Sequence, residues 1–273
     1  MDTIIAIILG IVEGLTEFLP ISSTGHLILS GELLGFTGDK ADTFEIVIQL
    51  GAILAVAVLY RQRIVDLLFG WKQKQITSER PSKDTRLNLL HIVLALLPAM
   101  ILGAILHDVI KTYLFSSKTV LWGLIVGGIF MIFAEKRQPI VRSQTIDQLS
   151  YKQALLIGLA QCLSLWPGFS RAGATLAGGL LVGASYKASA NFSFLIAIPM
   201  MIAASGYDLL KSYKLLTSSD IGFFAIGFIV AFVVALFAVV TFLRLLEKVK
   251  LAHFSYYRFF VAACYWVFIL RGR

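Results

Sequence analysis

The chain is organised around the stretch Glu13-Gly-Leu-Thr-Glu17-Phe-Leu-Pro20-Ile-Ser22-Ser23-Thr24-Gly25-His26, which places carboxylates, hydroxyls and an imidazole between apolar runs. Ionisable groups at membrane depth cost roughly 2.5 kcal/mol or more each, so they persist mainly where they line a functional cavity. Glu13 and Glu17 are four residues apart and share one face of a helix. Pro20 interrupts that helix, and the following hydroxyl residues can cap a second short helix over residues 25–34. The stretch therefore predicts a broken helix with polar side chains at its new N-terminus.

Composition sets the broad class of the protein. The 273 residues are 58% hydrophobic and only 15% charged, with a mean hydropathy of +0.83, which is typical of an integral membrane protein. Asp2, rather than a basic segment, precedes the short apolar run at residues 4–9, so no cleavable signal is expected. Cys162 and Cys264 lie in apolar segments and indicate no disulfide. The 24 Lys and Arg sit mostly in connections, so the net charge of +8 reflects membrane topology, and no nucleic-acid partner is expected.

Six apolar segments approach the roughly 20 residues that cross a bilayer. They are residues 44–60, 89–106, 120–134, 192–210, 221–243 and 259–270. Residues 3–35 and 152–183 are also apolar, but proline, glycine and polar clusters interrupt them, and each is long enough to enter the membrane and return as a re-entrant hairpin. Irregular backbone at that depth must be buried in protein or line a wet cavity. We therefore expect an all-α membrane protein with six transmembrane helices and two re-entrant helical hairpins, forming one domain over residues 1–273.

The basic residues predict an orientation. The connections 61–88 and 136–152, Lys187 and the segment 244–258 hold 16 Lys or Arg, whereas the opposite side holds 7. By the positive-inside rule, the first group is cytoplasmic. Both termini are then expected outside, on the periplasmic side if the source has two membranes. Arg171 belongs to neither side.

An internal repeat relates the two halves. Sliding the chain by 148 residues aligns residues 10–55 with 158–203 without a gap, and ten of those 46 positions are identical, including Ser22 with Ser170. The matched glycines and the absence of gaps indicate duplication. We expect a first repeat over 1–137 and a second over 148–273, each with one hairpin and three spans. An odd number of crossings inverts the second copy, and such repeats bind ligands where their broken helices meet, near the membrane midplane.

The second break reads Pro167-Gly-Phe-Ser170-Arg171-Ala-Gly173-Ala-Thr175. Two helix N-termini, an arginine fork and several hydroxyl donors describe an oxyanion site, and phosphate is the commonest ligand of such a site. The two carboxylates of the first break oppose an anion unless a divalent cation lies between them. Mg²⁺ and Ca²⁺ take oxygen ligands, so we expect Glu13 and Glu17 to hold Mg²⁺ or Ca²⁺ bridging to phosphate.

Both breaks carry a family resemblance. The motif Glu13-x-x-x-Glu17 with the following Pro-Ile-Ser-Ser-Thr-Gly-His, together with the second break, resembles the two signatures of the bacterial undecaprenyl-diphosphate phosphatase family, membrane enzymes linked to bacitracin resistance. The likeness runs through nearly the whole chain, including residues 44–51. It implies hydrolysis of undecaprenyl diphosphate to the monophosphate at the outer side of the cytoplasmic membrane, supporting peptidoglycan synthesis. It also implies a divalent metal, a homodimer and inverted repeats. Ala172 departs from the serine that the family commonly has.

The resemblance also implies roles for single residues. Glu13 and Glu17 correspond to the family's metal-associated acidic pair, and Arg171 corresponds to its diphosphate clamp. Ser23 and His26 are the candidates for nucleophile and acid/base, and Ser23 either attacks phosphorus directly or orients a water. The expected catalytic residues are Glu17, Ser23, His26 and Arg171, and the expected substrate-binding residues are Ser22, Thr24, Ser170, Arg171, Gly173 and Thr175.

Alternatives remain at this level. The hydroxyls of Ser22 and Ser170 can equally bond to nearby backbone, as hydroxyls in membrane helices usually do. Gly10 and Gly14 are expected to allow close helix packing rather than chemistry. A transporter or flippase for polyprenyl phosphate or another anion could use the same inverted architecture. The dense set of carboxylate, hydroxyl and imidazole groups favours hydrolysis over transport.

Overall fold

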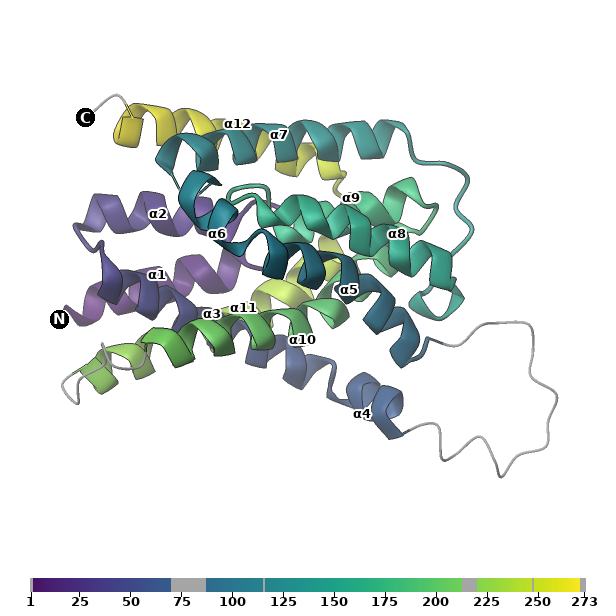
Figure 1. Ribbon diagram of the computed structural model, residues 1–273, viewed down its shortest axis with the longest axis horizontal. Helices are drawn as coiled ribbons and strands as arrows, with labels where there is room; N and C mark the ends of the chain where they lie inside the picture. Colours follow the sequence, from purple (N-terminus) through teal and green to yellow (C-terminus); the bar gives the residue numbers. More distant parts are fainter. Residues whose placement is uncertain (1, 70–86, 115, 213–219, 247, 271–273) are drawn as a thin grey trace.

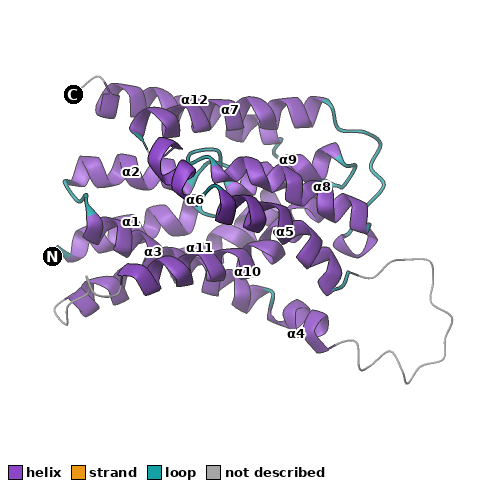
Figure 2. Ribbon diagram, in the orientation of Figure 1, coloured by secondary structure: helices purple, strands orange, loops and turns teal. Residues whose placement is uncertain are grey.

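The computed structural model describes residues 2–69, 87–114, 116–212, 220–246 and 248–270 (Figure 1). Over these ranges the chain is helical and contains no β-strand, and its only extended pairing is an isolated bridge between Ser143 and Ala184 (Figure 2). The all-α class predicted from the sequence is therefore confirmed. The two cysteines are free, also as predicted.

Both predicted hairpins are pairs of short helices. The first consists of α1 (Thr3–Thr16) and α2 (Ser23–Leu34). The second consists of α8 (Tyr151–Gln161), a 3₁₀ turn at Cys162–Leu165 and α9 (Arg171–Leu181). Each hairpin is thus interrupted where its proline and serine residues predicted a break.

The predicted spans correspond to six longer helices. These are α3 (Asp39–Leu59), α5 (Leu89–Ile105), α7 (Ser117–Lys136), α10 (Tyr186–Ser212), α11 (Ile221–Leu245) and α12 (Leu251–Tyr265), the last followed by a π-helical turn at Trp266–Leu270. Within the described ranges, four helices have the length and hydropathy of membrane spans, namely α3, α7, α10 and α11, while α5 is apolar but shorter. The described ranges also contain short helical pieces: α4 (Arg61–Phe69), α6 (His107–Val109), a π-helical turn at Ile110–Leu114 and a 3₁₀ turn at Ile146–Gln148.

Polar residues extend several helices beyond their apolar cores. Asp39 and Asp42 form the first turn of α3, five residues before the predicted start, and acidic side chains there favour the helix dipole. At the start of α7, Ser116 and Thr119 exchange side-chain and backbone hydrogen bonds in a capping box. Hydropathy alone misses such turns because their residues are polar.

The start of α12 corrects the number of basic residues assigned to the predicted cytoplasmic side. Residues 244–258 were expected as a cytoplasmic connection, but α12 begins at Leu251 and Arg258 is fully buried inside it. Arg258 therefore does not belong to the basic group that the sequence predicts to be cytoplasmic. Residues 70–86 of the other large basic connection lie outside the described ranges.

Close packing surrounds the first hairpin. The open faces of Gly10 and Gly14 lie against the carbonyl oxygens of Gly227 and Ala231 on α11, and an added Cβ would lie only 2.8 Å from either oxygen. Small residues allow this close approach of helix backbones, as expected for membrane helices. α11 also packs along α3, and α7 lies beside α12 (Figure 1).

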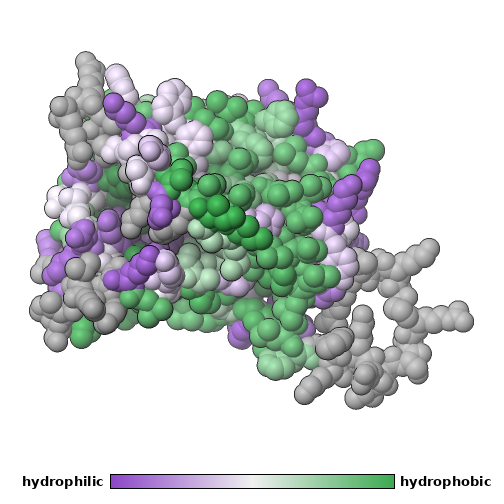
Figure 3. Space-filling model, in the orientation of Figure 1, coloured by the Kyte–Doolittle hydropathy of each residue, from purple (hydrophilic) through white to green (hydrophobic). Residues whose placement is uncertain are grey.

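The two ends of the helix bundle are polar and its middle is apolar. A wide hydrophobic band separates hydrophilic side chains at the two ends (Figure 3). α1 begins and the turn after α12 ends at one end, while α4 lies at the other (Figure 1). Lys40 and Asp220 form an ion pair of 3.0 Å between the starts of α3 and α11, and Arg63 of α4 pairs with Asp147. This distribution is that of a protein whose middle faces lipid.

Candidate active site

The two breaks have the same backbone geometry. Ser22 and Ser170 have φ angles of 72° and 76°, a conformation that residues other than glycine rarely adopt. Each serine caps the helix that follows: Ser22 Oγ accepts from the Gly25 amide at 3.4 Å, and Ser170 Oγ accepts from the Gly173 amide at 3.1 Å. Both hydroxyls are therefore engaged by backbone, the second of the two possibilities raised from the sequence.

Glu17 joins the two breaks. It ends α1 and is buried, with a side-chain exposure of 6%. Its Oε2 accepts a 2.5 Å hydrogen bond from Ser23 Oγ, and its Oε1 lies 3.4 Å from Nη2 of Arg171. Ser23 is the first residue of α2 and Arg171 the first residue of α9. The structure thus brings together three of the predicted catalytic residues, and it places the N-termini of both short helices beside them.

Glu13 lies one helical turn before Glu17 and is fully buried. Neither of its carboxylate oxygens has a hydrogen-bond partner among the described residues, which is unusual because buried polar groups are normally paired. Two such oxygens beside a second carboxylate fit an oxygen-preferring divalent cation. The described residues contain no cluster of three or more His, Cys, Asp or Glu side chains that could hold a metal. Mg²⁺ is commonly held by one or two carboxylates together with substrate phosphate and water, so the pair is compatible with it.

A buried network supports Arg171. Its Nη1 donates to the Ser193 carbonyl at 3.2 Å, and its Nε is buried without a partner within the described ranges. The Thr175 hydroxyl is fully buried, lies 2.6 Å from Ser193 Oγ and contacts the Arg171 carbonyl at 2.9 Å. Thr175 therefore supports the segment that carries Arg171, and the Thr175 hydroxyl is occupied by these hydrogen bonds. Ser193 was not predicted, and no motif marks it in the sequence.

Both ring nitrogens of His26 have hydrogen-bond partners other than Ser23. Its Nδ1 lies 2.7 Å from the Ser22 carbonyl, and its Nε2 lies 3.0 Å from the Tyr257 hydroxyl. The two rings stack with centroids 5.6 Å apart. A carbonyl only accepts, so Nδ1 carries a proton, and Tyr257 donates to Nε2 when the imidazole is neutral. Ser23 and His26 both lie on α2, which begins two residues before the predicted start, but the Ser23 hydroxyl donates its hydrogen bond to Glu17.

The remaining predicted binding residues lie around this centre. Thr24 is half-buried in the first turn of α2. Gly173 gives its amide to Ser170, and a Cβ at that position would lie 3.2 Å from Nη1 of Arg258. Gly173 therefore leaves room for the Arg258 side chain.

The sequence analysis did not predict Arg258 as a site residue, because its charge was assigned to the end of the connection 244–258. It is fully buried on α12 and donates to backbone carbonyls of both breaks. The mostly apolar and aromatic stretch from Leu251 to Leu270, which also holds His253 and Ser255, is the signal that could have placed the arginine inside a helix.

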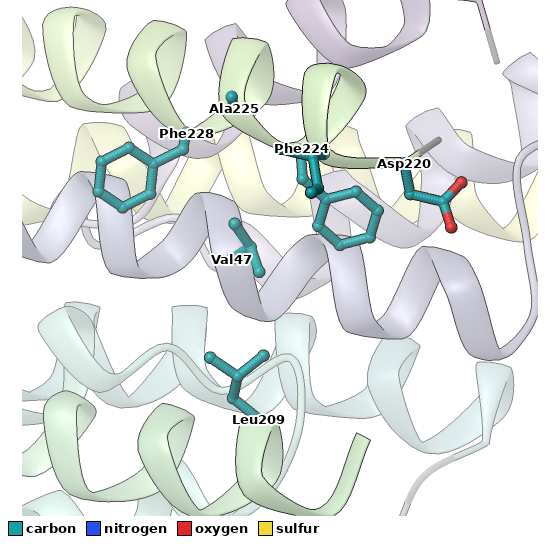
Figure 4. Close-up of a pocket in the computed structure, with 7 residues that line it drawn as sticks. Val47, Leu209, Asp220, Phe224, Ala225 and Phe228 are labelled. Carbon is teal, nitrogen blue, oxygen red and sulfur yellow. The ribbon is translucent and has the colours of Figure 1, made fainter. Parts of the chain in front are cut away.

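A separate apolar groove of about 300 Å³ lies between α3, α10 and α11. Val47, Leu209, Phe224 and Phe228 line it, with Asp220 at one end (Figure 4). None of the predicted site residues lines this groove. It is therefore distinct from the polar site at the breaks.

The chain is similar to known proteins over nearly its whole length. The family described as Bacitracin resistance protein BacA matches residues 6–264. The chain belongs to that family. Its BacA match spans every predicted site residue as well as Tyr257 and Arg258.

Individual BacA relatives are similar over their whole length. The chain is 56% identical over 271 residues to Undecaprenyl-diphosphatase 1 of Bacillus thuringiensis (strain Al Hakam), covering 98% of this chain and 99% of the relative. It is 56% identical over 269 residues to the protein of the same name from Bacillus anthracis, with the same coverage. It is 55% identical over 271 residues to that of Bacillus cereus (strain ZK / E33L), again covering 98% and 99%. These names agree with the family that the two sequence motifs indicated.

Proposed function

We propose that this protein is a membrane phosphatase that hydrolyses undecaprenyl diphosphate to undecaprenyl phosphate and inorganic phosphate. The observation that carries the proposal is the joining of Ser23, Glu17 and Arg171 at the two breaks. A hydroxyl bonded to a buried carboxylate, with a guanidinium beside it, supplies a nucleophile, a proton acceptor and an anion clamp in one place. The names of the full-length relatives support the same substrate and reaction.

Ser23 is the proposed nucleophile. Its Oγ attacks the terminal phosphorus while its proton passes to Oε2 of Glu17, which already accepts the hydrogen bond. The bond between that phosphorus and the bridging oxygen breaks, and undecaprenyl phosphate leaves with the bond's electron pair. Water then attacks the phosphoserine: its oxygen bonds to phosphorus, the bond from Ser23 Oγ to phosphorus breaks, and Oγ takes a proton from the water. Inorganic phosphate and the serine hydroxyl result, and the proton on Glu17 passes to solvent.

Charge neutralisation accompanies this bond cleavage. Arg171 offers its buried, unpartnered Nε to phosphate oxygens. The amides at the N-termini of α2 and α9 add favourable partial charge. Glu13 and Glu17 are the proposed ligands of Mg²⁺ or Ca²⁺, which would neutralise negative charge on the diphosphate when bound.

The proposal extends to the membrane setting. The six longer helices are the proposed transmembrane segments, and the two helix pairs are proposed re-entrant hairpins related as inverted repeats. The proposed site opens to the outer side of the bacterial cytoplasmic membrane, as the family resemblance implies. The basic connections favour a cytoplasmic location for the end that carries α4. We also propose a homodimer, in keeping with the family resemblance. Recycling of the lipid carrier would support peptidoglycan synthesis.

Phosphate release by the purified protein tests the function. Wild-type protein in detergent, supplied with undecaprenyl diphosphate and Mg²⁺, should release inorganic phosphate, whereas Ser23→Ala should be nearly inactive. Trapping and mass analysis of phosphoserine at Ser23 would establish direct attack. A modest loss in Ser23→Ala would instead indicate an activated water oriented by Ser23. If pure wild-type protein released no phosphate, the proposed activity would be wrong, and transport of the lipid phosphate would take its place.

A further inference from the structure

Every nitrogen of the Arg258 guanidinium donates hydrogen bonds to backbone carbonyl oxygens. The side chain carries five N–H donors, and it makes five hydrogen bonds to carbonyl oxygens: Nε to Leu124 at 3.1 Å, Nη1 to Phe169 at 2.8 Å and Pro20 at 3.4 Å, and Nη2 to Gly123 at 3.0 Å and Gly168 at 2.9 Å. Within the described ranges no carboxylate forms an ion pair with it. Nη1 also donates to the sulfur of Met131 at 3.6 Å. This fully buried cation is thus satisfied mainly by peptide carbonyls.

The five carbonyls come from three different segments. Pro20 belongs to the first break, Gly168 and Phe169 belong to the second, and the other two lie on α7. The three carbonyls of the breaks lie outside regular helices, so no helical amide is available to them. Unpaired carbonyls are costly in a membrane interior, and Arg258 supplies their missing donors. One side chain therefore binds both breaks and the helix that packs against them.

We propose that Arg258 is a positioning residue that fixes the two breaks relative to one another. It thereby holds Ser23 at the correct distance from Arg171. This inference rests on the proposed phosphatase function. Pro20 lies three residues before Ser23, and Phe169 lies two residues before Arg171, so each contact acts close to a reacting group. Because all five donors are engaged, the guanidinium has none left for substrate phosphate.

A positioning role differs from a purely electrostatic one in its tolerance of lysine. Arg258→Lys keeps the positive charge, but a single ammonium cannot reach carbonyls in three segments as the planar fork does. If Arg258 acted through charge alone, Arg258→Lys would keep activity that Arg258→Gln loses. If it acts by positioning, both variants should lower kcat on the order of tenfold or more while KM changes little, since small misplacements of reacting groups are costly.

Two neighbouring glycines on α7 provide a matched pair of variants. A Cβ added at Gly127 would collide with Nη2 of Arg258 and lie 2.6 Å from the Phe169 carbonyl, whereas one added at Gly128 would lie 2.6 Å from the Phe259 ring. Gly127→Ala therefore disturbs the guanidinium contacts while Arg258 is still present. Gly128→Ala adds the same methyl group against the same helix, but the atoms it meets belong to the outer part of the Phe259 ring and not to the guanidinium or to a carbonyl of the breaks.

Hydrogen–deuterium exchange supplies a readout that does not depend on activity. For each variant that elutes as a single species in detergent, exchange would be measured in peptides covering residues 17–24 and 166–172, alongside kcat and KM. Arg258→Lys and Gly127→Ala should exchange faster at both breaks and lose kcat, and Gly128→Ala should match wild type in both. Should Arg258→Lys fail to fold, Gly127→Ala decides alone.

Two results would overturn the proposal. One is wild-type exchange and wild-type kcat in both Arg258→Lys and Gly127→Ala. The other is full recovery of kcat by Arg258→Lys with loss in Arg258→Gln, which would assign a charge role. If wild-type protein released no phosphate, the phosphatase function would fail, while exchange at the two breaks would still test whether Arg258 holds them.

Discussion

Ser23 Oγ lies 2.5 Å from Oε2 of Glu17, across the turn between α1 and α2. The other oxygen of that carboxylate contacts Arg171 of the second break at 3.4 Å. One carboxylate therefore contacts the proposed nucleophile and the proposed clamp at once. Changes at Glu17 should disturb proton acceptance and the placement of Arg171 together.

Glu17→Gln should lower kcat by about 10²-fold or more, which is the usual cost of removing one well-placed electrostatic group. The amide keeps the shape of the side chain but cannot take the Ser23 proton, and its NH₂ group opposes the guanidinium. Phosphate release in detergent with saturating Mg²⁺ measures the effect. Asp66→Asn, which changes an exposed carboxylate on α4, is the control. Wild-type turnover in Glu17→Gln would contradict the assignment of this residue.

Chelation of divalent cations should abolish activity, and Mg²⁺ or Ca²⁺ should restore it. Glu13→Gln removes a carboxylate whose two oxygens are buried without partners, so the metal concentration that gives half-maximal activity should rise at least tenfold. Binding of the metal should also raise the Tm of wild-type protein more than that of Glu13→Gln, because a ligand stabilises the state that binds it. An unchanged metal requirement in Glu13→Gln would exclude this residue as a ligand.

Arg171→Lys should lower kcat/KM on the order of 10²-fold. Lysine retains the charge but loses the planar fork that matches phosphate oxygens, and it cannot reproduce the contacts of Arg171 with Glu17 and the Ser193 carbonyl. Steady-state kinetics with undecaprenyl diphosphate would show the loss. The matched control is Lys152→Arg, at an exposed position on α8. Equal activity in wild type and Arg171→Lys would show that charge alone suffices.

Thiol labelling in intact cells should establish the orientation. In a background without Cys162 and Cys264, a cysteine at Gln144 should resist an impermeant reagent, whereas one at Ser117 should react, because the basic connections favour the cytoplasmic side. Gln75, which lies outside the described residues, should behave like Gln144. Labelling after cell lysis controls for accessibility. Reaction at Gln144 from outside would reverse the proposed topology.

Local sequence predicted the helical breaks but could not predict their long-range partners. Pro20 and the following serines mark the end of one helix and the cap of the next, and the structure has both features there. The contact between His26 and Tyr257 joins residues 231 positions apart, and nothing in either local pattern indicates it. Ser193 was missed for the same reason. Such partners depend on how helices pack, which a single sequence does not contain.

Hydropathy also misplaced one boundary for a physical reason. An arginine normally ends a membrane segment because burying its charge is costly, so the last span was predicted to begin at Phe259. α12 instead begins at Leu251, since backbone carbonyls satisfy the buried guanidinium of Arg258. The carbonyls of the two breaks thus allow Arg258 to be buried, whereas the sequence alone placed its charge in water.

The left-handed backbone at Ser22 and Ser170 bears on folding stability. Each strained residue costs of order 1–3 kcal/mol, and glycine would adopt the same φ without that penalty. Glycine would, however, remove the hydroxyl that caps α2 or α9. A redesign of this chain for heat resistance alone would therefore favour glycine at both corners and weaken the rigid helix starts that carry Ser23 and Arg171. We therefore expect the serines, which cap these helix starts, to lower the thermal stability of the chain relative to glycine.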